Sequence, residues 1–257
     1  TGRAFRYALG RLTTVTRDPV FVLGNQKSGT TVIAAALAHC ANLSVTLDIR
    51  DLTADRLSRL YKGTTSLSAF VNRYRRSFSR SIIKEPGLTF TFEKLQSAFP
   101  KASFLLVVRD PRDNIRSVLD RLDLPGDASS LPLELLEKTN PIWQQVVKND
   151  ALGIRANHYI ESLAHRWNRA ANVYLQHSNQ INLARYETFC RDKTSYIKLL
   201  TERLSLSVTQ SPASVVQTQF QSQGNRTVSW TDFFGIENLT RIEQICAVNM
   251  SELNYKI

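Results

Sequence analysis

The chain has 257 residues and a formal net charge of +11, from 33 lysines and arginines against 22 aspartates and glutamates. This length suits one α/β domain, or one with an inserted cap, and no stretch approaches the roughly 18 apolar residues that span a membrane. The positive net charge favours an anionic partner but does not identify it. The sequence shows no zinc-finger spacing and no RNP-like aromatic strand that would indicate nucleic-acid binding.

The segment Phe21–Ala34, FVLGNQKSGTTVIA, is the first with a clear functional pattern. We expect a buried strand at Val20–Gly24, then a polar loop, then a small-residue helix at Thr30–Cys40. This order places backbone N–H groups and a lysine at a helix N-terminus, which is a favourable site for a phosphate.

The loop resembles a Walker P-loop but departs from it at two positions. Gly24 and Gly29 have the GxxxxG spacing, yet Thr30 and Thr31 stand where the motif has Lys and Ser/Thr. The lysine comes earlier, at Lys27, where it can reach the bridging oxygen of a departing phosphate. It does not suit a Mg-bound triphosphate. The alternative is an ordinary strand-to-helix turn with one exposed lysine.

Strands and helices are expected to alternate along the rest of the chain. The further strands are short and apolar, at Ser44–Asp48, Ser81–Lys84, Ser103–Arg109 and Ile181–Tyr186. The further helices are expected at Leu52–Tyr61, Phe90–Phe99, Asp113–Leu122, Tyr159–Gln176, Thr194–Leu204 and Ile236–Leu253. We therefore predict an α/β fold, a P-loop-like doubly wound parallel sheet of about five strands with helices on both faces. Ligands bind beyond the carboxyl ends of such strands, so the loops there should meet in one crevice.

A single domain is expected over residues 1–257, with two segments that fit the alternation less well. Residues 124–153 contain three prolines and two glycines and indicate an inserted lid or substrate loop. Residues 205–235 are rich in Ser, Gln and Thr. They indicate either a segment that covers a cofactor or a long surface connection.

A second phosphate site is expected in Phe104–Leu122, FLLVVRDPRDNIRSVLDRL. Arg109 ends a buried strand over the same crevice, and Ser117 lies about two turns into a helix that starts near Pro111. The guanidinium fork and the hydroxyl could together hold a phosphate. The alternative is a structural pair of Arg109 with Asp110. Two such sites on one sheet suggest a nucleotide with phosphates at two positions.

These motifs resemble those of the sulfotransferases that use 3′-phosphoadenosine 5′-phosphosulfate (PAPS), nearest to the protein-tyrosine and carbohydrate sulfotransferases. QKSGTT at Gln26–Thr31 is similar to the family's 5′-phosphosulfate loop, and Arg109 through Ser117 is similar to its 3′-phosphate motif. Further similar segments are IIKEP at Ile82–Pro86, FPKASFLLVVRD at Phe99–Asp110, HRWNRAANVY at His165–Tyr174, ARYETF at Ala184–Phe189 and ELNY at Glu252–Tyr255. The resemblance covers roughly Val20 to the C-terminus.

The resemblance implies PAPS as co-substrate, no metal, and a sulfate ester plus adenosine 3′,5′-bisphosphate as products. Sulfuryl transfer requires positioning, neutralisation of charge and removal of the acceptor's proton. Lys27 is expected at the leaving phosphate, and Lys84 resembles the family's catalytic lysine, unless it is a strand-end surface lysine. The residues expected to bind the cofactor are Lys27, Ser28, Gly29, Thr30, Thr31, Arg109, Ser117, Tyr186 and Arg226.

The catalytic base is expected to be Asp48, at the end of the second strand. Arg50 lies on the same side if the extended conformation persists, and a neighbouring arginine would weaken Asp48 as a base. In the protein-tyrosine enzymes a Glu-x-Arg pair stands at the corresponding place, so this chain has the shorter acid. Glu85, a histidine such as His158, or no protein base are the alternatives. Arg50 and Glu85 are also candidates for binding the acceptor.

The expected acceptor is a hydroxyl of a carbohydrate, a tyrosine or another phenol, and the positive charge suits an acidic glycan, an acidic peptide or an anionic lipid. The rival functions are another P-loop kinase or NTPase, and a non-enzymatic module that binds polyanions. Three widely spaced cysteines indicate buried free thiols. A cytoplasmic enzyme is expected, or one of the Golgi lumen if an anchor precedes the chain; the oligomeric state stays open.

Overall fold

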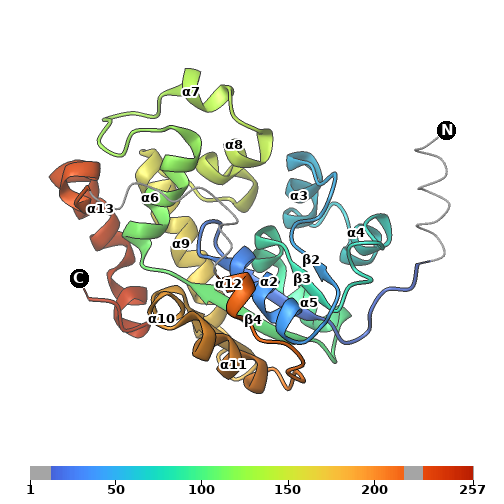
Figure 1. Ribbon diagram of the computed structural model, residues 1–257. Helices are drawn as coiled ribbons and strands as arrows, with labels where there is room; N and C mark the ends of the chain where they lie inside the picture. The colour runs from blue at the N-terminus through green and yellow to red at the C-terminus, as the bar shows by residue number, and fades with distance from the viewer. Residues whose placement is uncertain (1–12, 217–227, 257) are drawn as a thin grey trace.

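The computed structural model of the protein describes residues 13–216 and 228–256. A parallel sheet of five strands, in the order β2-β3-β1-β4-β5, runs through its centre (Figure 1). The strands are β1 Val20–Gly24, β2 Val45–Thr46, β3 Ile82–Lys84, β4 Ser103–Val108 and β5 Ile181–Arg185. The predicted fold class is confirmed.

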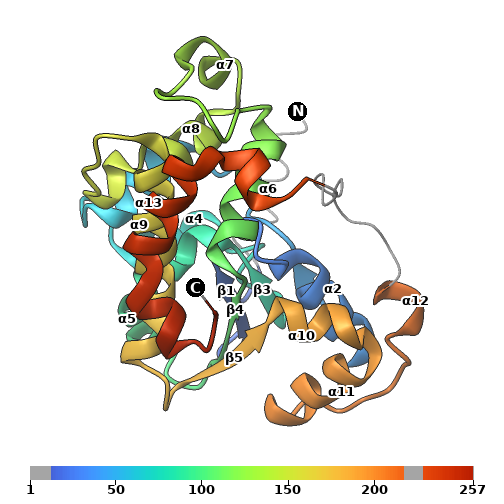
Figure 2. The same cartoon turned by 90° about the vertical axis from the view of Figure 1, so that its left-hand side faces the viewer.

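Helices cover both faces of this sheet. One face is covered by α4 Leu67–Arg73, α5 Phe92–Ala98, α6 Pro111–Leu122, α9 Tyr159–Gln176 and α13 Trp230–Glu252. The other is covered by α2 Thr30–Cys40, α10 Tyr186–Arg191, α11 Lys193–Arg203 and α12 Ala213–Val216. Figure 2 shows the two layers with the sheet between them, α9 and α13 on one side and α2 and α11 on the other.

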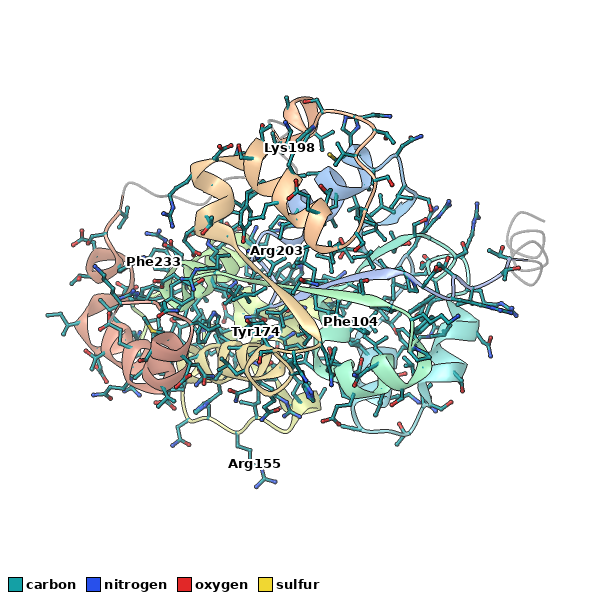
Figure 3. All side chains as sticks on the ribbon, turned by 90° about the horizontal axis from the view of Figure 1, so that it is seen from below. Phe104, Arg155, Tyr174, Lys198, Arg203 and Phe233 are labelled. Atoms are coloured by element: carbon teal, nitrogen blue, oxygen red, sulfur yellow. The ribbon has the colours of Figure 1, made fainter. Side chains whose placement is uncertain are left out.

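Alternate residues of the central strands point into two separate cores. Phe21 and Phe104 face the α9 side, where their rings stack at 5.5 Å and Phe92 meets Phe104 edge-on at 4.9 Å. Val22 and Leu105 face the α2 side. Because both faces are covered, the middle strands have runs of consecutive apolar residues, 20–23 in β1 and 104–108 in β4, rather than an apolar residue at every second position. Phe104 lies inside the body of the molecule, whereas the exposed Arg155 projects from it (Figure 3).

The long helices and most strands agree well with the prediction, whereas several short helices were not predicted. β1, α2 and α9 have the predicted bounds. The prediction omitted α4, α10 and α12, which have seven residues or fewer and so show little helical periodicity. α13 begins six residues before the predicted Ile236. Gly235 has a non-helical conformation, φ 68° and ψ 165°, and separates a short first part of α13 from the part that begins at Ile236.

The segment 124–153, predicted as an inserted lid or substrate loop, contains three short helices. It contains α7 Leu133–Glu137, α8 Pro141–Lys148 and the 3-10 helix η2 Asp150–Leu152. The Asn140 side chain caps α8 by accepting the Ile142 N–H, and Pro141 occupies the first turn. α8 packs against α9 and against α3, Ala54–Tyr61, the helix that follows β2. The remaining short helix is the 3-10 helix η1, Pro86–Thr91. None of the helices in the described part of the chain combines the length and hydrophobicity needed to cross a bilayer.

Candidate functional site

A cavity of about 870 Å³ lies at the carboxyl edge of the sheet. Residues that follow all five strands line it, together with residues of α8. Of the residues predicted for the site, it gathers Lys27, Gly29, Thr30, Thr31, Asp48, Lys84, Glu85, Arg109, Ser117 and Tyr186. Ser28 and Arg50 do not line it, and Arg226 lies outside the described residues.

The loop after β1 ends at the uncapped N-terminus of α2. Its N-cap is Gly29, which makes no side-chain capping bond, and the first turn contains no acidic residue. Thr30, Thr31 and Val32 of that turn line the cavity. A helix N-terminus of this kind has unpaired N–H groups and a positive dipole end, so it fits an anionic phosphate or phosphosulfate group.

Tyr186 packs directly against this loop. Gly29 has φ 92°, and a Cβ atom built there would lie 2.2 Å from the Tyr186 ring. Glycine is therefore required at this position for both backbone conformation and space. The contact holds an aromatic ring of the β5 end beside the phosphate-type loop.

Arg109 joins the two predicted phosphate motifs. Its Nη1 donates to the Lys27 carbonyl oxygen at 3.1 Å, and its guanidinium lies 5.0 Å from the Tyr186 ring centroid. The Trp167 indole N–H donates to the Arg109 carbonyl oxygen at 2.8 Å and so fixes the end of β4. Ser117 lines the cavity from α6. Lys27 and Arg109 therefore open onto one cavity.

Burial, together with the neighbouring Arg121 and Arg109, lowers the pKa of Lys27 to about 8, and the Asp120 carboxylate opposes this shift in part. The two arginines make the surroundings of Lys27 positive on balance, because its pKa stays below the ordinary value despite the nearby Asp120 carboxylate. The charge distribution thus favours a highly anionic ligand at this end of the cavity.

The affinity for an anionic donor is expected to fall as the pH rises through about 8. Below that pH Lys27 is protonated in the free protein, and above it Lys27 loses the proton. A bound anion keeps Lys27 protonated, so binding above pH 8 requires uptake of a proton and becomes weaker. Calorimetry with adenosine 3′,5′-bisphosphate should show Kd rising by up to about tenfold between pH 7.5 and 9.0. Lys27→Met should have a flat profile over that range. An equally steep profile in the variant would contradict this origin of the pH dependence.

The buried Arg166 of α9 lies behind the loop and was not identified from the sequence. It donates to Asn25 Oδ1 at 3.0 Å, Gln26 Oε1 at 2.8 Å and Asn149 Oδ1 at 2.7 Å, and lies 4.5 Å from the Phe90 ring centroid. The sequence does contain a signal: Arg166 shares a helix face with the apolar Leu163 and Ala170, three and four residues away.

The Asn114 side chain of α6 ties the same loop to the second motif. It accepts from Asn25 Nδ2 at 2.9 Å and donates to the Gln26 carbonyl oxygen at 2.8 Å and to Ser28 Oγ at 3.1 Å. The Ser28 hydroxyl therefore faces the protein interior rather than the cavity. Its predicted contact with a cofactor could involve only its backbone.

Lys84 and Asp48 form an ion pair at the other end of the cavity, with Nζ and Oδ1 2.6 Å apart. The Lys84 side chain is 4% exposed, which excludes the surface-lysine alternative, and that of Asp48 is 64% exposed. β2 ends at Thr46 rather than at Asp48, and the chain bends over residues 47–48. The extended conformation expected up to Arg50 therefore does not persist, and Arg50 is exposed outside the cavity.

Glu85 connects the loops that follow β2 and β3. Its two carboxylate oxygens accept the backbone N–H groups of Ile49 at 3.1 Å and Gly87 at 3.0 Å. Burial raises the pKa of Glu85, and the nearby Asp48 carboxylate raises it further. His158 caps α9 by accepting the Ile160 N–H and does not line the cavity. Of the candidate bases, Asp48 is the exposed one at the cavity.

The start of α13 is fixed on α6 beside the cavity. Asp113 accepts from the Trp230 indole at 2.9 Å and from Arg116 Nη2 at 2.6 Å, and Arg116 Nη1 donates to the Val228 carbonyl oxygen at 2.9 Å. Asp113 and Arg116 both line the cavity. Residues 228–230, two positions after Arg226, are thus held at the cavity wall.

The cysteines agree only in part with the expectation of buried thiols. Cys40 and Cys246 are buried and free, whereas Cys190 is exposed and lines the cavity, because it lies on the outer side of the short helix α10. Among residues 13–216 and 228–256, no cluster of three or more His, Cys, Asp or Glu side chains could hold a metal ion.

The fold is that of a P-loop-like α/β protein, and its cavity lies at the carboxyl edge of the sheet with Lys27 and Arg109 in its lining. Residues 17–233 match the family model described as a sulfotransferase domain. Because the match spans most of the chain, the protein belongs to the sulfotransferase domain family and is an enzyme that transfers sulfuryl groups.

Solved structures of low sequence identity share this fold. They include sulfotransferase STF9 from Mycobacterium avium, with 14% identity, a TM-score of 0.55 and coverage of 100% of this chain and 81% of the other. Mouse sulfotransferase SULT7A1, complexed with PAP, has 13% identity, a TM-score of 0.55 and coverage of 95% and 88%. The sulfotransferase domain from the curacin biosynthetic pathway has 13% identity, a TM-score of 0.53 and coverage of 95% and 100%. No curated protein sequence matches the chain.

Proposed function

We propose that the cavity holds PAPS across the carboxyl edge of the sheet and that its sulfuryl group is transferred to an acceptor hydroxyl. Family membership supports PAPS as the donor, and the mouse relative was solved with PAP. The observation that carries the proposal is the hydrogen bond from Arg109 to the Lys27 carbonyl oxygen, which brings both phosphate-type motifs to one cavity.

At the donor end, the α2 N-terminus and Lys27 bind the 5′-phosphosulfate. Arg109 and Ser117 bind the 3′-phosphate, and Tyr186, which contacts both Gly29 and Arg109, packs against the nucleoside. The donor supplies a sulfuryl group on a good leaving phosphate. The protein's task is then to place the donor and to neutralise the leaving oxygens.

At the acceptor side, Lys84 lies over the sulfuryl group and Asp48 accepts the proton of the acceptor hydroxyl. The acceptor oxygen forms a bond to sulfur as the bond from sulfur to the 5′-phosphate oxygen breaks, which leaves a sulfate ester and adenosine 3′,5′-bisphosphate. The ion pair at 2.6 Å holds Asp48 at this place, and its exposed carboxylate can reach a ligand. The acceptor is a hydroxyl of a carbohydrate, a tyrosine or another phenol.

Adenosine 3′,5′-bisphosphate is expected to stabilise the protein more than 5′-AMP, 3′-AMP or ATP with Mg²⁺. A ligand at 100 times its Kd adds about 2.7 kcal/mol, or roughly 5–10 °C in Tm for a chain of this size. Differential scanning fluorimetry measures the shift. In Arg109→Met the advantage over 5′-AMP should disappear. If ATP with Mg²⁺ stabilises the protein as much as adenosine 3′,5′-bisphosphate does, the proposal is wrong and a kinase or NTPase function replaces it.

A further inference from the structure

The cavity extends beyond the donor motifs toward β3 and β2. The sheet order places β4 and β5 on one side of the β1 loop and β3 and β2 on the other. The lining residues that follow β2 and β3, together with those of α8 and the turn before it, are called here the acceptor end. They are Asp48, Ile49, Leu52, Lys84, Glu85, Pro86, Thr139, Asn140, Ile142, Trp143 and Val146. α8 belongs to this end because it packs against α3.

Apolar side chains from two segments of the chain line the acceptor end. Ile49 and Leu52 come from the loop between β2 and α3, and Ile142, Trp143 and Val146 come from α8. Leu52 and Trp143 are partly buried and still line the cavity, so they keep accessible surface there. Covering such surface favours a ligand with an apolar body, and a partly exposed tryptophan favours an aromatic ring.

The charges at the acceptor end disfavour an anionic ligand. In the described part of the chain Lys84 is the only cation among the acceptor-end residues, and it is already paired with Asp48. Glu85 adds a second carboxyl group. The other lining cations follow β1, β4 and β5; they are Lys27, Arg109, Arg116, Arg121 and Lys193, and the carboxylates of Asp113, Asp120 and Asp123 line the same side. The cations that line the cavity and outnumber its carboxylates therefore lie on the donor side, not at the acceptor end.

We infer that the acceptor is an uncharged molecule whose hydroxyl is carried on an apolar aromatic ring, bound between Trp143 and the β2–α3 loop with its hydroxyl at Asp48. This inference rests on the proposed function and selects the phenol from its possible acceptors. It excludes the acidic glycan and the acidic tyrosine peptide that the net charge suggested.

A matched pair of acceptors tests the inference. Initial rates of transfer from sulfur-labelled PAPS are measured with 2-naphthol, with 6-hydroxy-2-naphthoic acid and with a glucuronate-containing disaccharide. The two naphthols share the ring and differ in one carboxylate, which is at the opposite end of the ring from the hydroxyl and so would lie against the apolar side chains of the acceptor end, away from Lys84, its only cation among the described residues. The kcat/KM for 2-naphthol should exceed that for the acid about tenfold or more, since burying an unpaired carboxylate against apolar side chains is strongly unfavourable. A preference for the acid or the disaccharide would overturn the inference.

Trp143→Ala localises the effect to the acceptor end. It should raise KM for 2-naphthol about tenfold, as expected for removal of a central aromatic contact, and leave KM for PAPS unchanged. Leu135→Ala is the matched control, because Leu135 is an exposed apolar residue of α7 that does not line the cavity. Equal values of KM for 2-naphthol in the two variants would contradict the proposed site.

Binding measurements separate failure of this inference from failure of the proposed function. Calorimetry follows 2-naphthol added to the protein saturated with adenosine 3′,5′-bisphosphate, in wild type and in Trp143→Ala. If the wild type binds the nucleotide but not 2-naphthol, the acceptor inference is wrong and the donor assignment stands. If the wild type does not bind the nucleotide, the proposed function itself is wrong.

Discussion

Lys27→Met is expected to lower kcat for sulfuryl transfer by about 10²–10³-fold, the cost of losing one preorganised group that stabilises charge in a transition state. Lys27 is half-buried at the apex of the loop, in a left-handed conformation at φ 66°, and lines the cavity. Methionine keeps most of the side-chain volume and removes the charge. The effect should therefore lie mainly in kcat, because charge on the leaving phosphate increases as the bond to sulfur breaks.

Lys101→Met is the matched control for this variant, because Lys101 is exposed in the turn before β4, away from the cavity. It should retain wild-type kcat and KM. Steady-state kinetics with labelled PAPS and a saturating acceptor compares the two variants. If Lys27→Met keeps kcat within threefold of wild type, another group must stabilise the leaving phosphate.

The parts of the site that were predictable depend on local sequence and on one rule of sheet topology. The loop around Lys27 is continuous in sequence, and Arg109 and Ser117 are separated by eight residues on a strand and its following helix. In parallel sheets the carboxyl ends of all strands lie at one edge, so these motifs and Tyr186 were expected to meet. The cavity that contains all of them agrees with that expectation.

The parts that were not predictable depend on contacts between distant segments. The Asp48–Lys84 pair requires a bend after β2, which no local signal at Leu47 specifies, and the same bend moves Arg50 out of the cavity. The helices α7 and α8 are too short for periodicity to distinguish them from a proline-rich loop. They are stabilised by packing against the rest of the protein, because Leu136 and Val146 are buried in the main core.

Arg166 combines a structural and an electrostatic role that no sequence motif revealed. Arg166 is 2% exposed, and its guanidinium donates to the neutral side-chain amides of Asn25, Gln26 and Asn149 rather than to a carboxylate. Burial lowers its pKa to about 10, so it stays charged at neutral pH. A positive charge therefore lies behind the phosphate-type loop. Arg166 also fixes the side chain of Gln26, which lines the cavity. Both effects favour a 5′-phosphate at the loop.

Arg166→Met is expected to destabilise the protein by about 3–5 kcal/mol, because three buried amide oxygens lose their donor at about 1–3 kcal/mol each, partly relieved by relaxation. Urea denaturation measures this loss, and Arg169→Met, an exposed arginine three residues later on α9, should cost far less. If the Arg166→Met variant is too unstable to purify, Arg166→Lys replaces it, because lysine keeps the charge but lacks the planar guanidinium fork.

Nucleotide binding distinguishes the two roles of Arg166. A purely structural role predicts unchanged ligand binding in the fraction of the protein that stays folded. The electrostatic role predicts instead, by calorimetry well below Tm, about tenfold weaker binding of adenosine 3′,5′-bisphosphate to Arg166→Met, while 3′-AMP, which has no 5′-phosphate, binds as it does to wild type. Equal weakening of both nucleotides would show that Arg166 supports the whole cavity rather than the 5′ end of the donor.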